Sequence, residues 1–100
     1  MSYRISRKAE DDIVQLYLTG VRLFGTAQAE RYYDGLERAF KFVAAHPLAV
    51  RERTEIDPPI RIHPYGAHLV VYMADDEGVL ILRIRHGRED WINDPESAPR

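Results

Sequence analysis

The chain has 100 residues, of which 45% are hydrophobic and 30% are charged, and its formal net charge is −2. These values are typical of one soluble domain with its own core, and the negative net charge argues against a general nucleic-acid-binding protein, which would be basic. The sequence contains no cysteine, which excludes disulfides and thiolate metal sites.

A short strand and a first helix are predicted at the N-terminus. The alternation Tyr3-Arg4-Ile5 suits a strand, and Ser6 suits the N-cap of a helix that follows it. Residues on one helical stripe then recur at the expected spacing: Ala9, Ile13, Leu16, Tyr17 and Gly20. Gly25 ends this helix after Phe24.

A second helix is predicted to start at Thr26, whose hydroxyl can cap it. His46-Pro47 stops it, because proline disfavours helical geometry in the residue before it. Its apolar stripe consists of Ala29, Tyr32, Tyr33, Leu36, Phe40 and Val43. The tight turn at Gly25 makes the two helices an antiparallel hairpin, and most of their aromatic side chains are expected to pack in the core.

The second half of the chain is predicted to form a meander of three strands. Residues 47–59 are either the crossover from helices to sheet or a flexible binding loop, and we favour the crossover. The strands are expected at Ile60–His63, Ala67–Ala74 and Val79–His86. A turn at Pro64-Tyr65-Gly66 and a hairpin loop at residues 75–78 connect them.

Neither end of the chain predicts an anchor. The N-terminus lacks the apolar run of a signal peptide, and no apolar stretch is long enough to span a bilayer, so we expect a cytoplasmic protein without a membrane partner. Residues 93–100 hold two prolines and no aliphatic run, which predicts a flexible tail after a domain of residues 1–92.

The segment Val79–Trp91 joins the most strand-like stretch to a cluster of positive charges. Alternation predicts that one set of side chains faces the core: Leu80, Leu82 and Ile84. The other face of the strand would then be open and basic, with Ile81, Arg83 and Arg85. Trp91 either folds back on the core or anchors a partner.

Several short motifs follow one another along the chain. The first half contains Ser6-Arg7-Lys8-Ala9, Asp12-Ile13, Tyr17, Phe24-Gly25, Ala29-Glu30-Arg31-Tyr32 and His46-Pro47. The second half contains Ile60-Arg61, Gly66, His68-Leu69-Val70-Val71-Tyr72 and Ile84-Arg85-His86-Gly87-Arg88-Glu89-Asp90-Trp91. This ordered set covers residues 3–91 and resembles the ParE toxins of bacterial toxin–antitoxin pairs. One departure is Ala49-Val50, where family members often carry a glycine before an arginine.

The resemblance implies an α+β protein with the RelE/ParE-like fold, in which a helical hairpin packs on a mainly antiparallel sheet in the order β-α-α-β-β-β. It also implies a toxin that inhibits DNA gyrase, without a cofactor, and is neutralised by a ParD-like antitoxin in a hetero-oligomer. The wider superfamily includes RelE-like ribosome-dependent mRNA endonucleases, so an RNA-cleaving toxin is the alternative. A purely structural interaction module is a third possibility.

The residue types argue against the RNA-cleaving alternative. Cleavage through the 2′-hydroxyl needs a base, an acid and cations for the phosphate. The candidates would be His86, Arg61, Arg83 and Arg85, with His63 and His68 as further acids or bases. RelE-like nucleases resemble each other in lysine-rich or tyrosine-bearing sites, whereas this sheet has no lysine and the residues after His86 have no tyrosine. We therefore expect a toxin that is not an enzyme. No metal site is expected either, because no two histidines have helical ligand spacing.

Two surfaces are expected to carry the function. The apolar stripes exceed what one hairpin and one sheet can hide, which predicts an exposed groove beside the hairpin, filled by an amphipathic antitoxin segment that also pairs with a sheet edge. Its candidate contacts are Tyr17, Phe24, Tyr32 and Tyr33. The candidate target contacts are Arg83, Arg85, Arg88 and Trp91. No direct sequence-specific contact with nucleic acid is expected.

Overall fold

The structure is a computed structural model and describes residues 2–87. The elements are β1 (Tyr3–Ile5), α1 (Arg7–Phe24), α2 (Thr26–Ala45), β2 (Glu52–Arg53), β3 (Ile60–Tyr65), β4 (His68–Asp75) and β5 (Gly78–His86). The predicted order is confirmed, with β2 as one additional short strand inside the crossover. Within the described residues, no helix is long and apolar enough to cross a membrane.

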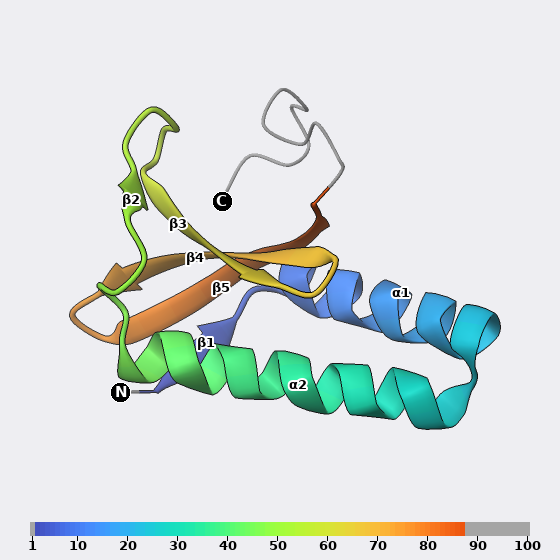
Figure 1. The fold of residues 1–100 in the computed structure, drawn as a ribbon. Helices are drawn as coiled ribbons and strands as arrows, with labels where there is room; N and C mark the ends of the chain where they lie inside the picture. The colour runs from blue at the N-terminus through green and yellow to red at the C-terminus, as the bar shows by residue number, and fades with distance from the viewer. Residues whose placement is uncertain (1, 88–100) are drawn as a thin grey trace.

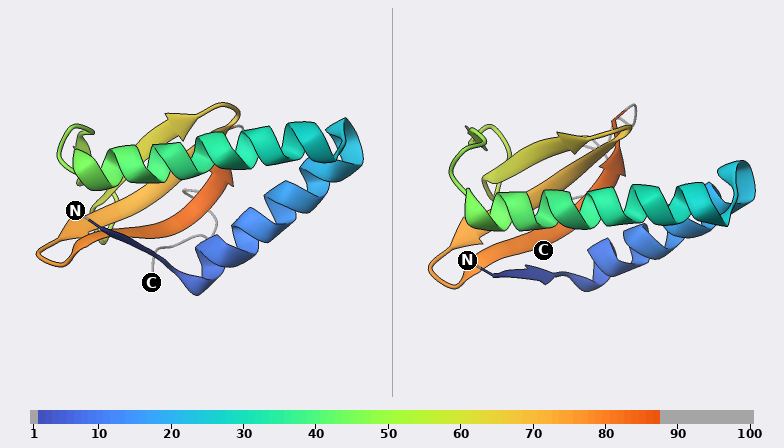
Figure 2. Two further views of the ribbon diagram at one scale, coloured as in Figure 1. Left: turned by 90° about the horizontal axis from the view of Figure 1, so that it is seen from below. Right: turned by 60° about the horizontal axis from the view of Figure 1, so that its bottom comes forward.

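The strands form one sheet in the order β1-β5-β4-β3-β2, and both helices lie on the same face of it (Figures 1 and 2). β1 pairs with β5 in parallel, and all other neighbours are antiparallel. The α+β class and the mainly antiparallel sheet are thus confirmed. The turn expected at Pro64-Tyr65-Gly66 is shorter than predicted, because Pro64 and Tyr65 still pair with β4.

The helix boundaries agree with the sequence except at one cap. The Ser6 hydroxyl accepts a hydrogen bond from the Ala9 backbone N–H at 3.0 Å, as expected of an N-cap. Thr26, however, is the first residue of α2, and Gly25 takes the cap position without a side chain. Gly25 has φ +88°, a conformation that glycine adopts without steric cost, so the tight turn itself depends on this residue.

The main core lies between the sheet and α2. Leu36, Phe40 and Val43 of α2 pack with Tyr72 and Ile81 of the sheet, and all five side chains are buried. In α1, by contrast, only Ala9 is buried. α1 therefore contributes less to the core than α2 and leaves several apolar side chains exposed.

A β-bulge reverses the predicted facing of residues 80–82 of β5, whereas Arg83, Ile84 and Arg85 face as predicted. Tyr72 lies opposite Ile81 and Val71 lies opposite Arg83, so Leu82 is an extra residue on β5. Ile81 and Ile84 consequently both face the helices, whereas Leu82 joins a second cluster on the far face of the sheet.

This far face carries a buried apolar cluster, contrary to the prediction of an open surface, although Arg83 and Arg85 lie on it opposite Val71 and Leu69. Ile60, Val71 and Leu82 are buried there, and Leu80 packs against them with Ile56 from the crossover. Uniform alternation placed Leu80, Leu82 and Ile84 on one face. That prediction is wrong, because the bulge shifts the alternation and leaves Leu80 and Leu82 on the face opposite Ile84.

Candidate partner-binding groove

A groove of about 610 Å³ lies between α1, the start of α2 and the end of the sheet. The residues from α1 are Asp12, Gln15, Leu16, Thr19, Gly20, Leu23 and Phe24. α2 contributes Gln28, Ala29 and Tyr32, and the strand ends with their connecting turn contribute Ala67, His68, Ile84, Arg85 and His86. The predicted groove beside the hairpin therefore exists.

The groove forms because the hairpin extends past the ends of the strands (Figures 1 and 2). Leu23 and Phe24 lie at the tip of the hairpin and are 57% and 63% exposed. Large apolar side chains that stay this exposed next to a concave surface are typical of an interaction site. The walls near the tip are therefore suited to apolar contact with a partner.

Hydrogen bonds around Tyr32 form the sheet end of the groove. The Tyr32 hydroxyl accepts from the Ala67 N–H at 3.1 Å and donates to the Tyr65 carbonyl at 3.2 Å. It also lies 2.7 Å from Nδ1 of His68. Burial raises the pKa of the Tyr32 hydroxyl, although the Ala67 hydrogen bond opposes this shift. The hydroxyl therefore keeps its proton at neutral pH.

Two histidines meet beside Tyr32. His68 and His86 are directly opposite each other on β4 and β5, and their ring centroids are 5.4 Å apart. The Tyr32 ring approaches His68 edge-on at 5.5 Å. Arg85, next to His86, also lines this part of the groove. The groove thus has apolar walls and one end rich in polar and basic groups.

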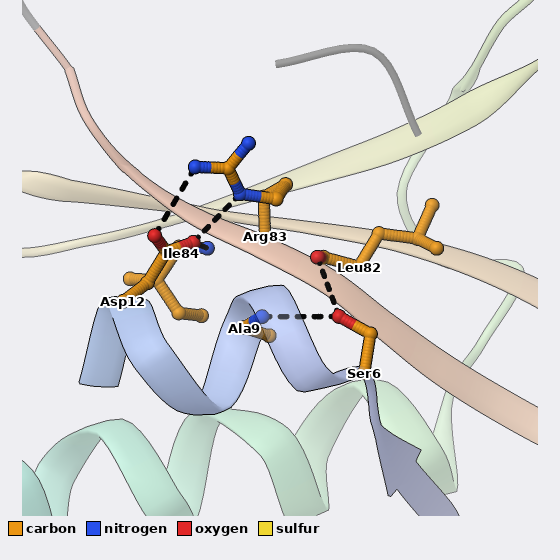
Figure 3. A network of polar contacts seen from close by, with 6 residues as sticks. All are labelled: Ser6, Ala9, Asp12, Leu82, Arg83 and Ile84. Carbon is orange, nitrogen blue, oxygen red and sulfur yellow. Dashed lines mark hydrogen bonds and ion pairs between the residues drawn. The ribbon is translucent and has the colours of Figure 1, made fainter. Parts of the chain in front are cut away.

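α1 is attached to β5 by a partly buried ion pair, shown in Figure 3. The Asp12 carboxylate accepts from Nε of Arg83 at 2.8 Å and from its Nη2 at 3.1 Å. It also accepts from the Ile84 backbone N–H at 2.9 Å. The side chains are only 18% and 12% exposed. Arg83 was predicted to lie on an open surface. It does face away from the helices, opposite Val71, but the prediction that it is open is wrong, because Asp12 pairs with it and leaves its side chain only 12% exposed.

The predicted antitoxin contacts divide into two pairs. Phe24 and Tyr32 line the groove, whereas Tyr17 and Tyr33 are half-buried elsewhere on the hairpin. Leu16, Gly20 and Leu23 also line the groove and were not predicted as contacts. In the sequence, the pair Leu23-Phe24 before Gly25 could have indicated this end of the groove, since two large apolar residues at a hairpin tip have little to pack against.

The predicted target contacts are only partly described. Arg85 is half-buried, and Arg83 is engaged by Asp12. Arg88 and Trp91 lie outside the described residues.

The residues predicted for RNA cleavage do not all lie together, since His68, Arg85 and His86 line the groove and Arg61 and His63 do not. Arg61 lies opposite Tyr72, four residues along β4 from His68 and hence about 13 Å from the His68–His86 pair. Its guanidinium donates to the Val50 carbonyl. His63 stacks on Phe42 of α2 with a centroid distance of 5.3 Å, and burial lowers its pKa. Among residues 2–87, no group of three acidic or histidine side chains could hold a metal ion.

Comparisons with known proteins agree with this fold. A family model described as the ParE toxin of type II toxin–antitoxin system, parDE, matches residues 3–91. The chain is 30% identical over 89 residues to Toxin ParE1 from two strains of Mycobacterium tuberculosis, covering 88% of this chain and 91% of the relative. A solved structure, the chromosomal ParDE TA system from P. aeruginosa, matches with a TM-score of 0.72. At 21% identity, over 86% of this chain and 95% of the other, that match supports the fold.

Proposed function

Because the chain belongs to the ParE toxin family of type II toxin–antitoxin systems, we propose that it inhibits DNA gyrase and is held inactive by a ParD-like antitoxin. The observation that carries the antitoxin part is the apolar groove beside the hairpin, whose tip residues Leu23 and Phe24 are exposed. The gyrase part follows from the resemblance to ParE toxins. The complex would form in the cytoplasm.

An amphipathic segment of the antitoxin would occupy the groove. Leu16 and Gly20 lie one turn apart on α1 and leave space for apolar side chains, while Leu23 and Phe24 close the tip. Such a segment would be disordered alone and would fold on binding, because the groove supplies the apolar surface it lacks. Its pairing with a sheet edge stays a prediction.

We propose that the toxin acts by binding and not by cutting RNA. Two observations support this: the backbone of Arg61 is about 13 Å along the strand from the histidine pair, and its guanidinium donates to the Val50 carbonyl. Of the candidate target contacts, Arg85, Arg88 and Trp91 remain as predictions. Arg83 instead holds β5 to α1, so its loss would affect folding as well as any target contact.

A pair of leucine variants tests the groove. Leu23→Asp should weaken binding of the antitoxin encoded beside this gene by at least about tenfold, since burying a leucine contributes roughly 1.5–3 kcal/mol. Leu48→Asp is the control, because Leu48 is 72% exposed and lies outside the groove. Isothermal titration calorimetry on both variants, with melting curves to verify folding, gives the comparison. Equal affinity for both folded variants would place the antitoxin elsewhere.

A further inference from the structure

α1 carries a second apolar stripe that is separate from its contacts with the core. Val14, Tyr17, Leu18 and Val21 follow one another at helical spacing, which places all four on one side of the helix. Val14 and Leu18 are 52% and 57% exposed, and Tyr17 and Val21 are half-buried. We call these four residues the outer stripe of α1.

The outer stripe does not belong to the groove. The described lining residues of the groove include none of the four, and Leu18 lies about 200° around the helix from Leu16, which does line it. α1 lies at the margin of the molecule, with α2 and the sheet on its inner side (Figure 2). The groove and the outer stripe can therefore be occupied at the same time.

A second copy of the chain fits the outer stripe, because the stripe is symmetric about its midpoint. A two-fold axis that passes between Tyr17 and Leu18 places Val14 opposite Val21 of the other copy. The same axis places Tyr17 opposite Leu18 of the other copy. Each apolar side chain that the fold leaves exposed then meets another apolar side chain, which is how two helices bury a shared stripe.

The charges beside the stripe favour an antiparallel pair of helices. Asp11 and Arg22 lie at opposite ends of the stripe and on the same flank, since eleven residues make about three helical turns. Both are exposed, and neither has an ion pair among residues 2–87. In the antiparallel pair, Asp11 lies within about 3 Å along the helix axis of the level of Arg22 in the other copy. A parallel pair would place Asp11 beside Asp11.

We propose that two copies of this chain associate through the outer stripes of their α1 helices, which run antiparallel about a two-fold axis. This inference goes beyond the proposed function and does not depend on it. One helix face buries less surface than a standard interface of about 1,600 Å², so the dimer forms reversibly as the concentration rises. Each copy keeps its groove open, so one dimer can bind two antitoxin segments.

Sedimentation velocity of the full chain at increasing concentration tests the association. The mean mass should rise from that of one chain, 11.6 kDa, toward twice that value. Leu18→Asp should raise the dissociation constant of the dimer by at least about tenfold, and Leu18→Ala, which keeps helix propensity, should raise it several-fold. Leu23→Asp is the matched control and should leave it unchanged, because Leu23 is also 57% exposed but lines the groove.

A charge exchange tests the antiparallel arrangement. Asp11→Arg and Arg22→Asp should each weaken the dimer, because each places like charges side by side. The double variant Asp11→Arg/Arg22→Asp should recover the wild-type dissociation constant. Within one chain these positions are about 16 Å apart along the helix, so recovery reports a contact between copies. A double variant that dimerises no better than the single variants overturns the inference.

Disulfide trapping measures the register, because the chain contains no cysteine of its own. A mixture of Val14→Cys and Val21→Cys should form a disulfide between the two variants faster than either forms one with itself. Identical positions lie about 10 Å apart along the axis, which is farther than a disulfide spans. Leu18→Cys lies at the two-fold axis and should cross-link with itself, whereas the equally exposed Leu23→Cys should do so more slowly.

The remaining outcomes are decisive in either direction. The mass of a single chain at every concentration, or an unchanged dissociation constant in folded Leu18→Asp and Leu18→Ala, overturns the inference. Loss of antitoxin binding in folded Leu18→Asp would assign the outer stripe to the antitoxin and also overturn it. Failure of the wild-type chain to bind the antitoxin overturns the proposed function instead and leaves the dimer standing.

Discussion

Asp12 shows how one side chain can replace part of a strand. β1 pairs with β5 only as far as Ile81. Beyond that point the Ser6 hydroxyl donates to the Leu82 carbonyl at 2.8 Å, and Asp12 accepts from the Ile84 N–H. Two side chains from the first half of the chain therefore satisfy backbone groups along the edge of β5, and the same carboxylate neutralises Arg83.

Removing either partner of this ion pair should destabilise the fold. Asp12→Ala and Arg83→Ala should each lower the free energy of unfolding by about 3 kcal/mol, since breaking a buried ion pair costs roughly 3–5 kcal/mol and some solvent reaches this one. The double variant should lower the free energy of unfolding by less than the sum of the two single effects, because it leaves neither charge without its partner. Urea denaturation measures all three.

The ion pair between Arg4 and Asp75 provides the control. Its side chains are 47% and 57% exposed, so Arg4→Ala should change stability by less than about 1 kcal/mol. If Arg83→Ala were as mild as Arg4→Ala, the structural role given to Arg83 would be incorrect.

For individual side chains, the sequence predicted interactions between near neighbours better than those between residues far apart in the chain. The Ser6 cap was predictable because its partner is three residues away. The Asp12–Arg83 pair spans 71 residues, and no local pattern indicates it. The bulge at Leu82 depends on how β4 and β5 pair, so the facing of Leu80, Ile81 and Leu82 could not be read from alternation along one strand.

Helix α2 and strand β3 approach each other closely at Gly35. A Cβ added at Gly35 would lie 1.9 Å from the Tyr65 hydroxyl oxygen. That hydroxyl donates to the Tyr32 backbone carbonyl at 3.1 Å, and the Tyr32 and Tyr65 rings pack at 4.9 Å. Gly35 therefore lets a β3 side chain contact the backbone of α2 at Tyr32, which lines the groove.

Gly35→Ala should destabilise the protein although it improves helix propensity. The gain of roughly 0.5–1 kcal/mol from replacing a helical glycine is smaller than the roughly 1–3 kcal/mol cost of overpacking. Gly20→Ala is the control, since its added Cβ would meet Ala29 at 3.4 Å, an ordinary contact, so that variant should keep the propensity gain. Thermal melting compares the two variants. A higher melting temperature for Gly35→Ala than for Gly20→Ala would contradict the role given to Gly35.

The helices were predicted well because their apolar spacing persists over 18 and 20 residues. The short strand β2 was missed, since two residues carry no periodic pattern. The length of β3 was also underestimated. Pro64 reads as a turn residue, yet β3 is next to a strand of only two residues, so Pro64 has β4 on one side and no ladder bond to lose on the other.

For the whole molecule, the layer arrangement explains why a groove exists. Both helices cover one face of the sheet, and α2 supplies most of that core while α1 extends toward the hairpin tip (Figure 2). The far face carries its own apolar cluster around Ile60, Val71 and Leu82. The sequence predicted an excess of apolar surface and thus a groove, but its position at the strand ends required the packing of α1.

Gyrase inhibition is the central claim, and a supercoiling assay with purified components tests it most directly. Adding the toxin to DNA gyrase should reduce supercoiling and accumulate cleaved DNA, and an equimolar amount of the antitoxin should restore normal activity. The account would be contradicted if gyrase stayed fully active in the presence of the folded toxin while the toxin cut ribosome-bound messenger RNA, with the cuts abolished by His86→Asn.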